Sequence, residues 1–135
     1  MPAFRLTERV CVTQADVRKL QLGKGAISAG AQVMIQAYGV SLDEIGELLL
    51  AGGFGSYIRP ESAARIGLIP AQLLPVTRAI GNAAAQGART ALVSTQARER
   101  LANLRANMEY LELSGLAAFN EAYIDAMLFP EEGEL

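Results

Sequence analysis

Histidine and tryptophan are both missing from the 135-residue sequence, and Cys11 is its one cysteine. Zinc sites, iron–sulfur clusters and disulfide bonds need several Cys or His residues, so the sequence excludes all three, together with a His-based catalytic triad. Because Cys11 stands between Val10 and Val12, we expect it to be a buried strand residue. A reactive thiol would need an activating base that the nearby residues do not offer.

An excess of positive charge is also missing. The chain has 12 Lys and Arg against 14 Asp and Glu, which gives a net charge of −2. Arg98, Arg100 and Arg105 alternate with Glu99, a pattern that indicates a solvated helix face. Since this distribution makes no basic surface, we expect no nucleic-acid partner.

Long hydrophobic runs are absent as well. Runs such as residues 48–51 are far shorter than the roughly 18 residues that a membrane span needs, and the N-terminus has no signal-peptide core. We therefore expect a cytoplasmic protein that does not insert into a membrane. The composition is nevertheless 51% hydrophobic and only 19% charged, which suggests surface that something else normally covers. No linker divides the chain, so we expect a single domain over residues 1–135 with a solvated acidic tail at 131–135.

Residues 48–51 join the most apolar run to the densest group of glycines. The run Leu-Leu-Leu-Ala predicts a short strand of a parallel sheet, buried on both faces. Gly52, Gly53 and Gly55 then turn the chain at the carboxyl end of that strand, where α/β sheets bind ligands. The alternative is a tight turn that requires positive φ and binds nothing.

A second strand also runs into small residues. Residues 76–80 predict a strand, and an Ala- and Gly-rich helix follows directly after Gly81 and Asn82. Asn82 is a good N-cap for this helix, and it can either act only as a cap or also face a ligand. The small residues should let the helix lie very close to a sheet or to another helix.

The longest predicted helix covers residues 14–38. Thr13 and Asp16 form a capping box at its start, and Gly39 suits the left-handed position after its end. Lys24 lies inside it between two glycines, each of which costs about 1 kcal/mol of helix propensity relative to alanine. Either a ligand or partner approaches closely here and Lys24 offers charge to a phosphate, or the helix packs tightly and Lys24 reaches solvent.

Shorter elements complete the predicted order. A strand-like pattern covers residues 3–12, a capped turn follows Ser41, and Pro60 begins a short helix. Further along we expect a helix through 101–108, a strand at 109–113 and a closing helix. The closing helix should pack its apolar stripe into the core; the stripe consists of Leu116, Phe119, Tyr123 and Met127.

Several motifs resemble one known group of proteins. The glycine turn at 51–55 and the Gly81-Asn82 turn look like the carboxyl-terminal lobe of the superfamily of acetate and sugar kinases, heat-shock chaperones and actin. Residues 13–18, 21–27 and 66–70 (Ile-Gly-Leu-Ile-Pro) further resemble the end of the ATP-dependent reductive activators of corrinoid proteins. This resemblance implies an α/β class, a layered actin/kinase-like (ribonuclease H-like) lobe with a small mixed sheet flanked by helices.

The resemblance also implies a function. Such activators carry a ferredoxin-like [2Fe–2S] domain, a middle segment and this lobe, and they couple ATP to electron transfer onto the cobalt of a corrinoid methyl carrier. ATP or ADP with Mg²⁺ would bind here in a site shared with a missing lobe, and this chain would hold no iron–sulfur cluster, metal ligand or catalytic residue. The residues that the resemblance implies to bind the nucleotide are Gly52, Gly53, Phe54, Gly55, Ser56 and Asn82. Lys24, between its two glycines, is a further candidate for binding a phosphate.

The same resemblance implies two partners, a corrinoid methyl-carrier protein and the missing N-terminal lobe in cis or in trans. The excess of apolar residues adds a third expected partner, a second copy in a homodimer. The chain has no Asp-x-Gly-x-[Ser/Thr] phosphate loop, so it should be inactive as an ATPase alone. Two alternatives stay open. One is a non-catalytic self-association or docking module that binds no nucleotide, and the other is a kinase-like or CoA-dehydratase-activator branch of the superfamily.

Overall fold

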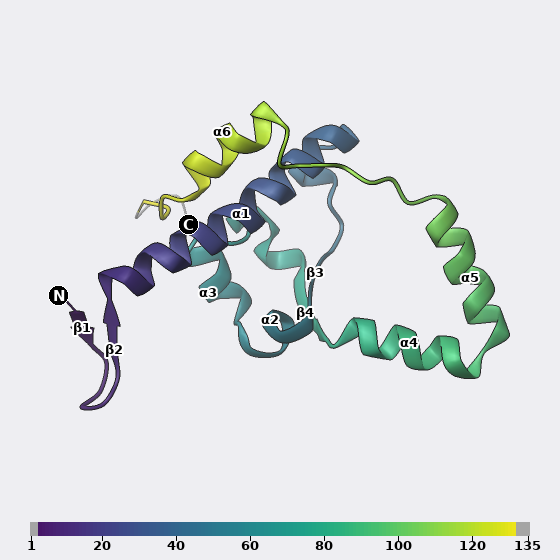
Figure 1. Ribbon diagram of the computed structural model, residues 1–135, viewed down its shortest axis with the longest axis horizontal. Helices are drawn as coiled ribbons and strands as arrows, with labels where there is room; N and C mark the ends of the chain where they lie inside the picture. Colours follow the sequence, from purple (N-terminus) through teal and green to yellow (C-terminus); the bar gives the residue numbers. More distant parts are fainter. Residues whose placement is uncertain (1–2, 132–135) are drawn as a thin grey trace.

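The structure is a computed structural model that describes residues 3–131, except for the side chain of Phe54. One long helix crosses the molecule, and the strands and short helices lie beside it (Figure 1). The elements, in chain order, are β1 (Ala3–Arg5), β2 (Cys11–Thr13), α1 (Gln14–Tyr38), the 3₁₀ helix η1 (Leu42–Glu44), β3 (Leu48–Ala51), α2 (Gly52–Tyr57), α3 (Pro60–Arg65), the 3₁₀ helix η2 (Ala71–Val76), β4 (Thr77–Gly81), α4 (Ala83–Val93), α5 (Thr95–Ala106) and α6 (Ala117–Ala126).

The ends of α1 are where local chemistry predicts them. The Thr13 hydroxyl accepts a hydrogen bond from the Asp16 N–H at 3.2 Å, and the Asp16 carboxylate accepts from the Thr13 N–H at 2.9 Å. At the other end Gly39 has φ 77°, and its N–H donates to the Ile35 carbonyl at 3.1 Å. Both caps confirm the predicted helix of residues 14–38.

The strands form two separate ladders. β1 and β2 pair antiparallel in a hairpin that leads into α1, whereas β3 and β4 pair parallel from Leu48 and Thr77 onward. The α/β class with small sheets flanked by helices is confirmed. Within residues 3–131 the strands form two separate two-stranded ladders, one antiparallel and one parallel, rather than one mixed sheet.

One face of β3 is covered by the core. Leu48 and Leu50 pack against the buried cluster of Ala63, Ala64, Leu68 and Ile69, which α3 and the loop after it supply. The side chain that points the other way, Leu49, is 43% exposed. The expectation of a strand buried on both faces was therefore wrong, because no described element of this chain covers the second face.

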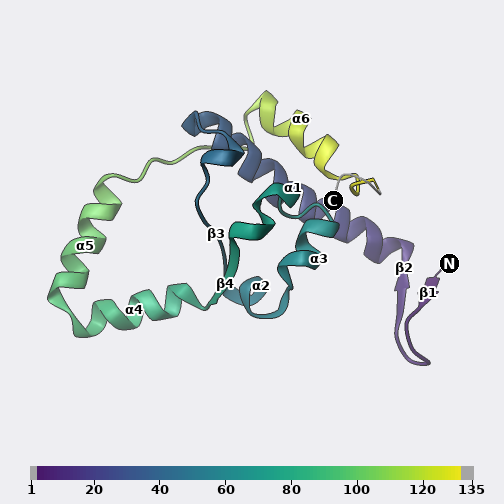
Figure 2. The same cartoon turned by 180° about the vertical axis from the view of Figure 1, so that it is seen from behind.

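A second layer forms where α6 lies along α1, as both views show (Figures 1 and 2). A Cβ added to Gly25 would meet Tyr123 and Met127 at 3.1–3.3 Å. Gly25 therefore permits tight helix packing, one of the two explanations that the sequence left open. The rings of Phe119 and Tyr123 stack with centroids 6.0 Å apart, so the predicted stripe does face the interior of this layer, although its members are only half buried.

The helices α4 and α5 form an arm that extends away from the other elements (Figures 1 and 2). No residue of α4 or α5 is buried, and Leu92 and Val93 are 79% and 83% exposed. The predicted close packing of the Ala- and Gly-rich face is therefore not found within the described chain. Residues 109–113 form no strand, because no other strand within residues 3–131 pairs with them.

Two further expectations concern exposure. Cys11 is exposed in β2, contrary to the expected burial, because the hairpin has no second layer packed against it. Of the acidic tail only Glu131 belongs to the described residues, and it is exposed; residues 132–135 lie outside them. Among residues 3–131, no helix has both the length and the hydrophobicity required to cross a bilayer.

Candidate functional site

The two small-residue turns meet at one edge of the β3–β4 ladder. Ala51, the last residue of β3, pairs with Gly81, the last residue of β4. Gly52 and Asn82 therefore start their helices side by side, which confirms the expectation that both turns share the carboxyl edge. The neighbourhood of the two strand ends can be followed in Figure 2.

Backbone conformation accounts for two of the glycines at this edge. Gly52 has φ 75° and Gly81 has φ 63°, values that side-chain-bearing residues rarely adopt. The requirement for positive φ that the sequence left open is therefore met at Gly52. Conformation alone explains why these two positions carry glycine, whether or not a ligand binds.

Gly55 and Gly53 differ in what surrounds them. A Cβ on Gly55 would lie 2.0 Å from the Leu50 carbonyl oxygen, so the close packing of α2 on the end of β3 requires glycine there. A Cβ on Gly53 would meet nothing within 4 Å, and its φ lies outside the left-handed region. Neither packing nor conformation within the described chain requires glycine at residue 53.

The polar side chains at this edge are partly engaged. The Asn82 Oδ1 accepts a hydrogen bond from the Ala85 N–H at 3.0 Å, which confirms Asn82 as the N-cap of α4. The Ser56 hydroxyl donates to the Gly52 carbonyl at 3.2 Å. The side chain of Phe54 lies outside what the structure describes, so its part in the site stays a prediction.

Lys24 lies elsewhere, in the middle of α1. Its side chain is only 3% exposed, so the expectation that it reaches solvent was wrong. The Nζ donates a hydrogen bond to the Leu128 carbonyl and lies 5.1 Å from the centroid of the Phe129 ring. Burial lowers the pKa of the Lys24 ammonium from its ordinary value of 10.5.

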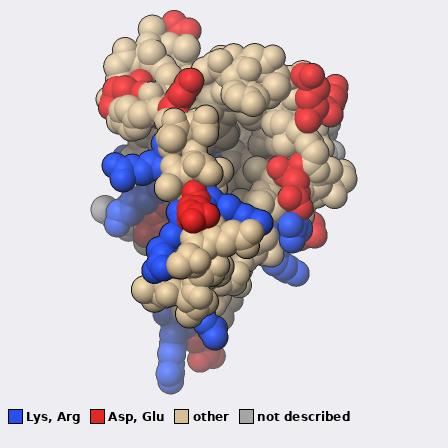
Figure 3. Space-filling view, turned by 90° about the vertical axis from the view of Figure 1, so that its right-hand side faces the viewer, with Lys and Arg blue, Asp and Glu red and all other residues tan. Residues whose placement is uncertain are grey.

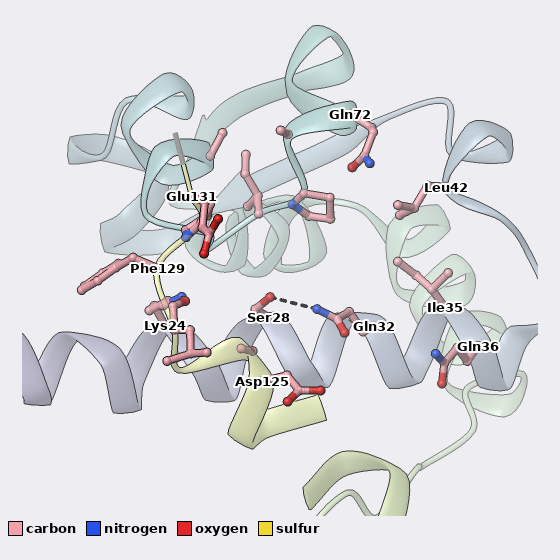
Figure 4. A pocket seen from close by; sticks show the side chains of 18 of the residues that line it. Lys24, Ser28, Gln32, Ile35, Gln36, Leu42, Gln72, Asp125, Phe129 and Glu131 are labelled. Atoms are coloured by element: carbon pink, nitrogen blue, oxygen red, sulfur yellow. Dashed lines mark hydrogen bonds between the residues drawn. The ribbon is translucent and has the colours of Figure 1, made fainter. Parts of the chain in front are cut away.

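Lys24 lines a groove that sequence reasoning missed. The α1 groove, as we call it, has a volume of about 1010 Å³ and lies between α1, the segment from Gly67 into η2, and residues 125–131 (Figure 4). None of residues 52–56 is among those that line it, and neither is Asn82. Its one signal in the sequence is the four-residue spacing of Ser28, Gln32 and Gln36, which places polar side chains along one line of α1.

The described candidate residues at the carboxyl edge, Gly52, Gly53, Gly55, Ser56 and Asn82, carry no charge. The ion pair of Glu47 and Arg78, 2.5 Å long, lies on the ladder before its carboxyl end and is exposed to solvent. Figure 3 shows broad uncharged areas on one side of the molecule. Within residues 3–131 no group of three or more His, Cys, Asp or Glu side chains is arranged to hold a metal ion.

Comparisons with known proteins give the family. Residues 3–135 match the family described as the C-terminal domain of RACo, the ASKHA domain. A curated relative, the corrinoid activation enzyme RamQ of Eubacterium limosum, is 35% identical over 121 residues, which are 89% of this chain and 20% of that protein.

A solved structure gives the same result. The reductive activator for a corrinoid, iron–sulfur protein superposes with a TM-score of 0.82 at 34% identity, over 89% of this chain and 19% of that one. The chain thus spans about a fifth of the length of the relatives that it matches. With the family match extending over almost every residue, the chain belongs to the family of the RACo C-terminal ASKHA domain.

Proposed function

We propose that the carboxyl edge of the β3–β4 ladder walls the adenosine of ATP or ADP in a reductive activator of a corrinoid protein. One observation carries this proposal: Ala51 pairs with Gly81, so the two small-residue turns stand at the same strand ends. Ligands of α/β sheets bind at such edges. The family match supports the proposal, since the two relatives are described as a corrinoid activation enzyme and a reductive activator.

The residues at this edge would bind and orient the nucleotide without doing chemistry on it. Gly53 leaves open space into which a nucleoside could approach the backbone closely, and the Asn82 amide group would be available beside it. None of the candidate residues carries a carboxylate, so they do not fit Mg²⁺, which prefers oxygen ligands such as carboxylates. Mg²⁺ and the phosphates would therefore depend on groups outside this edge.

Lys24 was a candidate nucleotide ligand because of its position between two glycines, but its described contacts favour another role. The ammonium is buried and donates to the Leu128 carbonyl, and the groove that it lines contains no residue of either turn. We therefore propose Gly52, Gly53, Ser56 and Asn82 as the nucleotide contacts and assign Lys24 to holding residues 128–129.

Gly53→Val tests this proposal. A Cβ added at residue 53 would have open space within 4 Å, so valine should leave the fold intact while it fills the space proposed for the nucleoside. We expect ADP affinity to fall by at least about tenfold in a titration followed by calorimetry or amide shifts. Gly87→Val in α4 is the matched control, because it is also a helical glycine whose Cβ would meet nothing within 4 Å. Equal affinities of both variants and the wild type would refute the site.

The partner and the alternative role rest on different observations. A corrinoid protein is the proposed partner of the complete activator, on the names of the two relatives. The exposed apolar surface instead favours a docking or self-association role for this chain, with or without nucleotide. Three of the residues that form it are Leu92, Val93 and Tyr57. Gly53→Val should leave any such association unchanged, which separates the two functions.

A further inference from the structure

The arm formed by α4 and α5 carries positive charge that has no partner in the described chain. It contains four arginines and a single acidic residue, Glu99, all of them exposed. The four are Arg89, Arg98, Arg100 and Arg105. Within residues 3–131 none of these arginines forms an ion pair. Since the arm stands away from the other elements in both views (Figures 1 and 2), its charged and apolar side chains are available to an acidic partner.

One face of α5 combines two of these arginines with two leucines. Leu101 lies three residues after Arg98 and four residues before Arg105, and residues at this spacing lie side by side on a helix. Leu104 follows three residues after Leu101 and borders the same face. Leu101 is 47% exposed and Leu104 is 61% exposed, so both leucines are available for contact. We call these four residues, Arg98, Leu101, Leu104 and Arg105, the arm face.

The outer face of α6 has the opposite charge. Tyr123 lies on the side of α6 that faces Gly25 of α1, and residues two positions from it are turned to the other side of the helix. Two acidic and two apolar residues are exposed there, of which Ile124 is 62% and Leu128 is 70% exposed. Residues 107–130 contain four acidic residues and no Lys or Arg. We call Glu121, Ile124, Asp125 and Leu128 the α6 face; Asp125 also borders the α1 groove.

The arm face and the α6 face complement each other but lie apart within one chain. Each has two apolar side chains, with arginines on one face and carboxylates on the other, so contact between them would bury apolar surface and pair opposite charges. α6 lies along α1, whereas α5 stands apart from both (Figures 1 and 2). Because both faces belong to the same chain, a second copy supplies what each face lacks. We propose that two copies exchange contacts, the arm face of each on the α6 face of the other, in a closed two-fold dimer.

Charge reversal tests this dimer. One double variant, Arg98→Glu with Arg105→Glu, makes the arm face acidic, and a second, Glu121→Arg with Asp125→Arg, makes the α6 face basic. In either variant alone, like charges oppose each other at both contacts, so the dissociation constant of the dimer should rise at least about tenfold. An equimolar mixture of the two should dimerise as the wild type does, because every arm face then meets an α6 face of opposite charge. Sedimentation velocity over a range of concentrations measures both results.

Two controls separate this contact from general effects of charge. Arg18→Glu with Lys19→Glu changes the net charge as much as the arm variant does, at exposed positions of α1 outside both faces, and should dimerise like the wild type. The wild-type dimer should weaken as NaCl is added, since salt screens exposed charges.

Four results would overturn the proposal: a wild type that stays monomeric at millimolar concentration, a wild-type dimer that salt leaves unchanged, an arm variant that dimerises as tightly as the wild type, or a mixture that stays monomeric. The measurement needs no nucleotide, so its failure would not bear on the nucleotide site.

Discussion

At the scale of single residues, Gly55 shows how a glycine can be demanded by packing alone. A Cβ there would lie 2.0 Å from the Leu50 carbonyl oxygen. The backbone of Gly55 or of Leu50 would therefore have to shift to make room for it. We expect Gly55→Ala to lower the free energy of unfolding by about 2–3 kcal/mol, in the range of overpacking substitutions. Urea denaturation followed by circular dichroism measures the change.

Gly87→Ala is the control for that substitution. Gly87 lies in α4 with open space around its Cβ position, so alanine should gain helix propensity there, by about 1 kcal/mol at most. If Gly55→Ala proved as harmless as Gly87→Ala, the close approach of α2 to β3 would be wrong.

The buried ammonium of Lys24 gives a prediction about pH. Burial lowers its folded pKa below the ordinary value of 10.5, so between the two values the unfolded chain binds more protons than the folded one. The free energy of unfolding should therefore rise with pH across the window that ends near 10.5, relative to Lys24→Met. Denaturation of both proteins at several alkaline pH values measures the difference.

Lys19→Met controls for the removal of a lysine as such, because Lys19 is an exposed residue of the same helix. This variant keeps Lys24 and should retain the rise with pH. Parallel pH profiles for the wild type and Lys24→Met would contradict the burial of the charge.

At the scale of elements, the start of α1 depends on an ionised carboxylate. Hydrogen bonds from the Thr13 hydroxyl and the Thr13 N–H lower the pKa of Asp16 below its ordinary value of 3.8. A lowered pKa stabilises the folded state above 3.8, and this contribution is lost as pH falls through the folded pKa. Amide-exchange protection factors in the first turn of α1, corrected for the intrinsic rate at each pH, should fall on acidification, and Asp16→Asn should abolish that dependence. An unchanged dependence in Asp16→Asn would exclude the capping box as its source.

The cap of α4 can be separated from any ligand contact of the same residue. Asn82→Ala removes the acceptor for the Ala85 N–H and should destabilise α4 by about 1 kcal/mol, whereas Asn82→Ser keeps an acceptor. Amide exchange at residues 83–86 measures the cap, and an ADP titration of Asn82→Ser measures the ligand contact. If Asn82→Ser bound ADP as tightly as wild type, Asn82 would be a cap and nothing more.

Elements defined by neighbours in the sequence were predictable, and those that need distant partners were not. Both ends of α1 depend on residues within four positions of the caps, so residues 14–38 could be assigned in advance. The strand predicted at 109–113 had the right pattern but no adjacent strand, and Cys11 had apolar neighbours but no covering layer. Pattern indicates which face is apolar, but it does not say what lies against that face.

The candidate site shows the same difference between features set by nearby residues and features set by distant ones. The shared edge of residues 52–56 and Asn82 followed from two strand–turn units, because parallel strands align their carboxyl ends. The position of Lys24 did not follow, since its partners Leu128 and Phe129 are about a hundred residues away in the chain. The α1 groove was missed for the same reason, because its walls come from three distant segments.

At the scale of the whole molecule, the apolar surface is extensive for a chain of this size. Leu92, Val93 and Tyr110 are 79–84% exposed, and one face of β3 is uncovered. Relatives about five times longer provide a simple reason, because further polypeptide could cover these surfaces. Studied alone, the chain should self-associate through them. Sedimentation velocity should show a sedimentation coefficient that rises with concentration, and a strictly monomeric chain would contradict this explanation.

Binding of adenosine at the paired ends of β3 and β4 can be tested on the isolated chain. The most direct measurement is a titration of the ¹⁵N-labelled chain with ADP and with adenosine, followed by amide shifts. We expect both ligands at millimolar concentration to shift the amides of Gly52, Gly53, Ser56 and Asn82 and to leave those of the α1 groove unchanged. Unshifted amides at these four residues, or shifts confined to the groove, would contradict it.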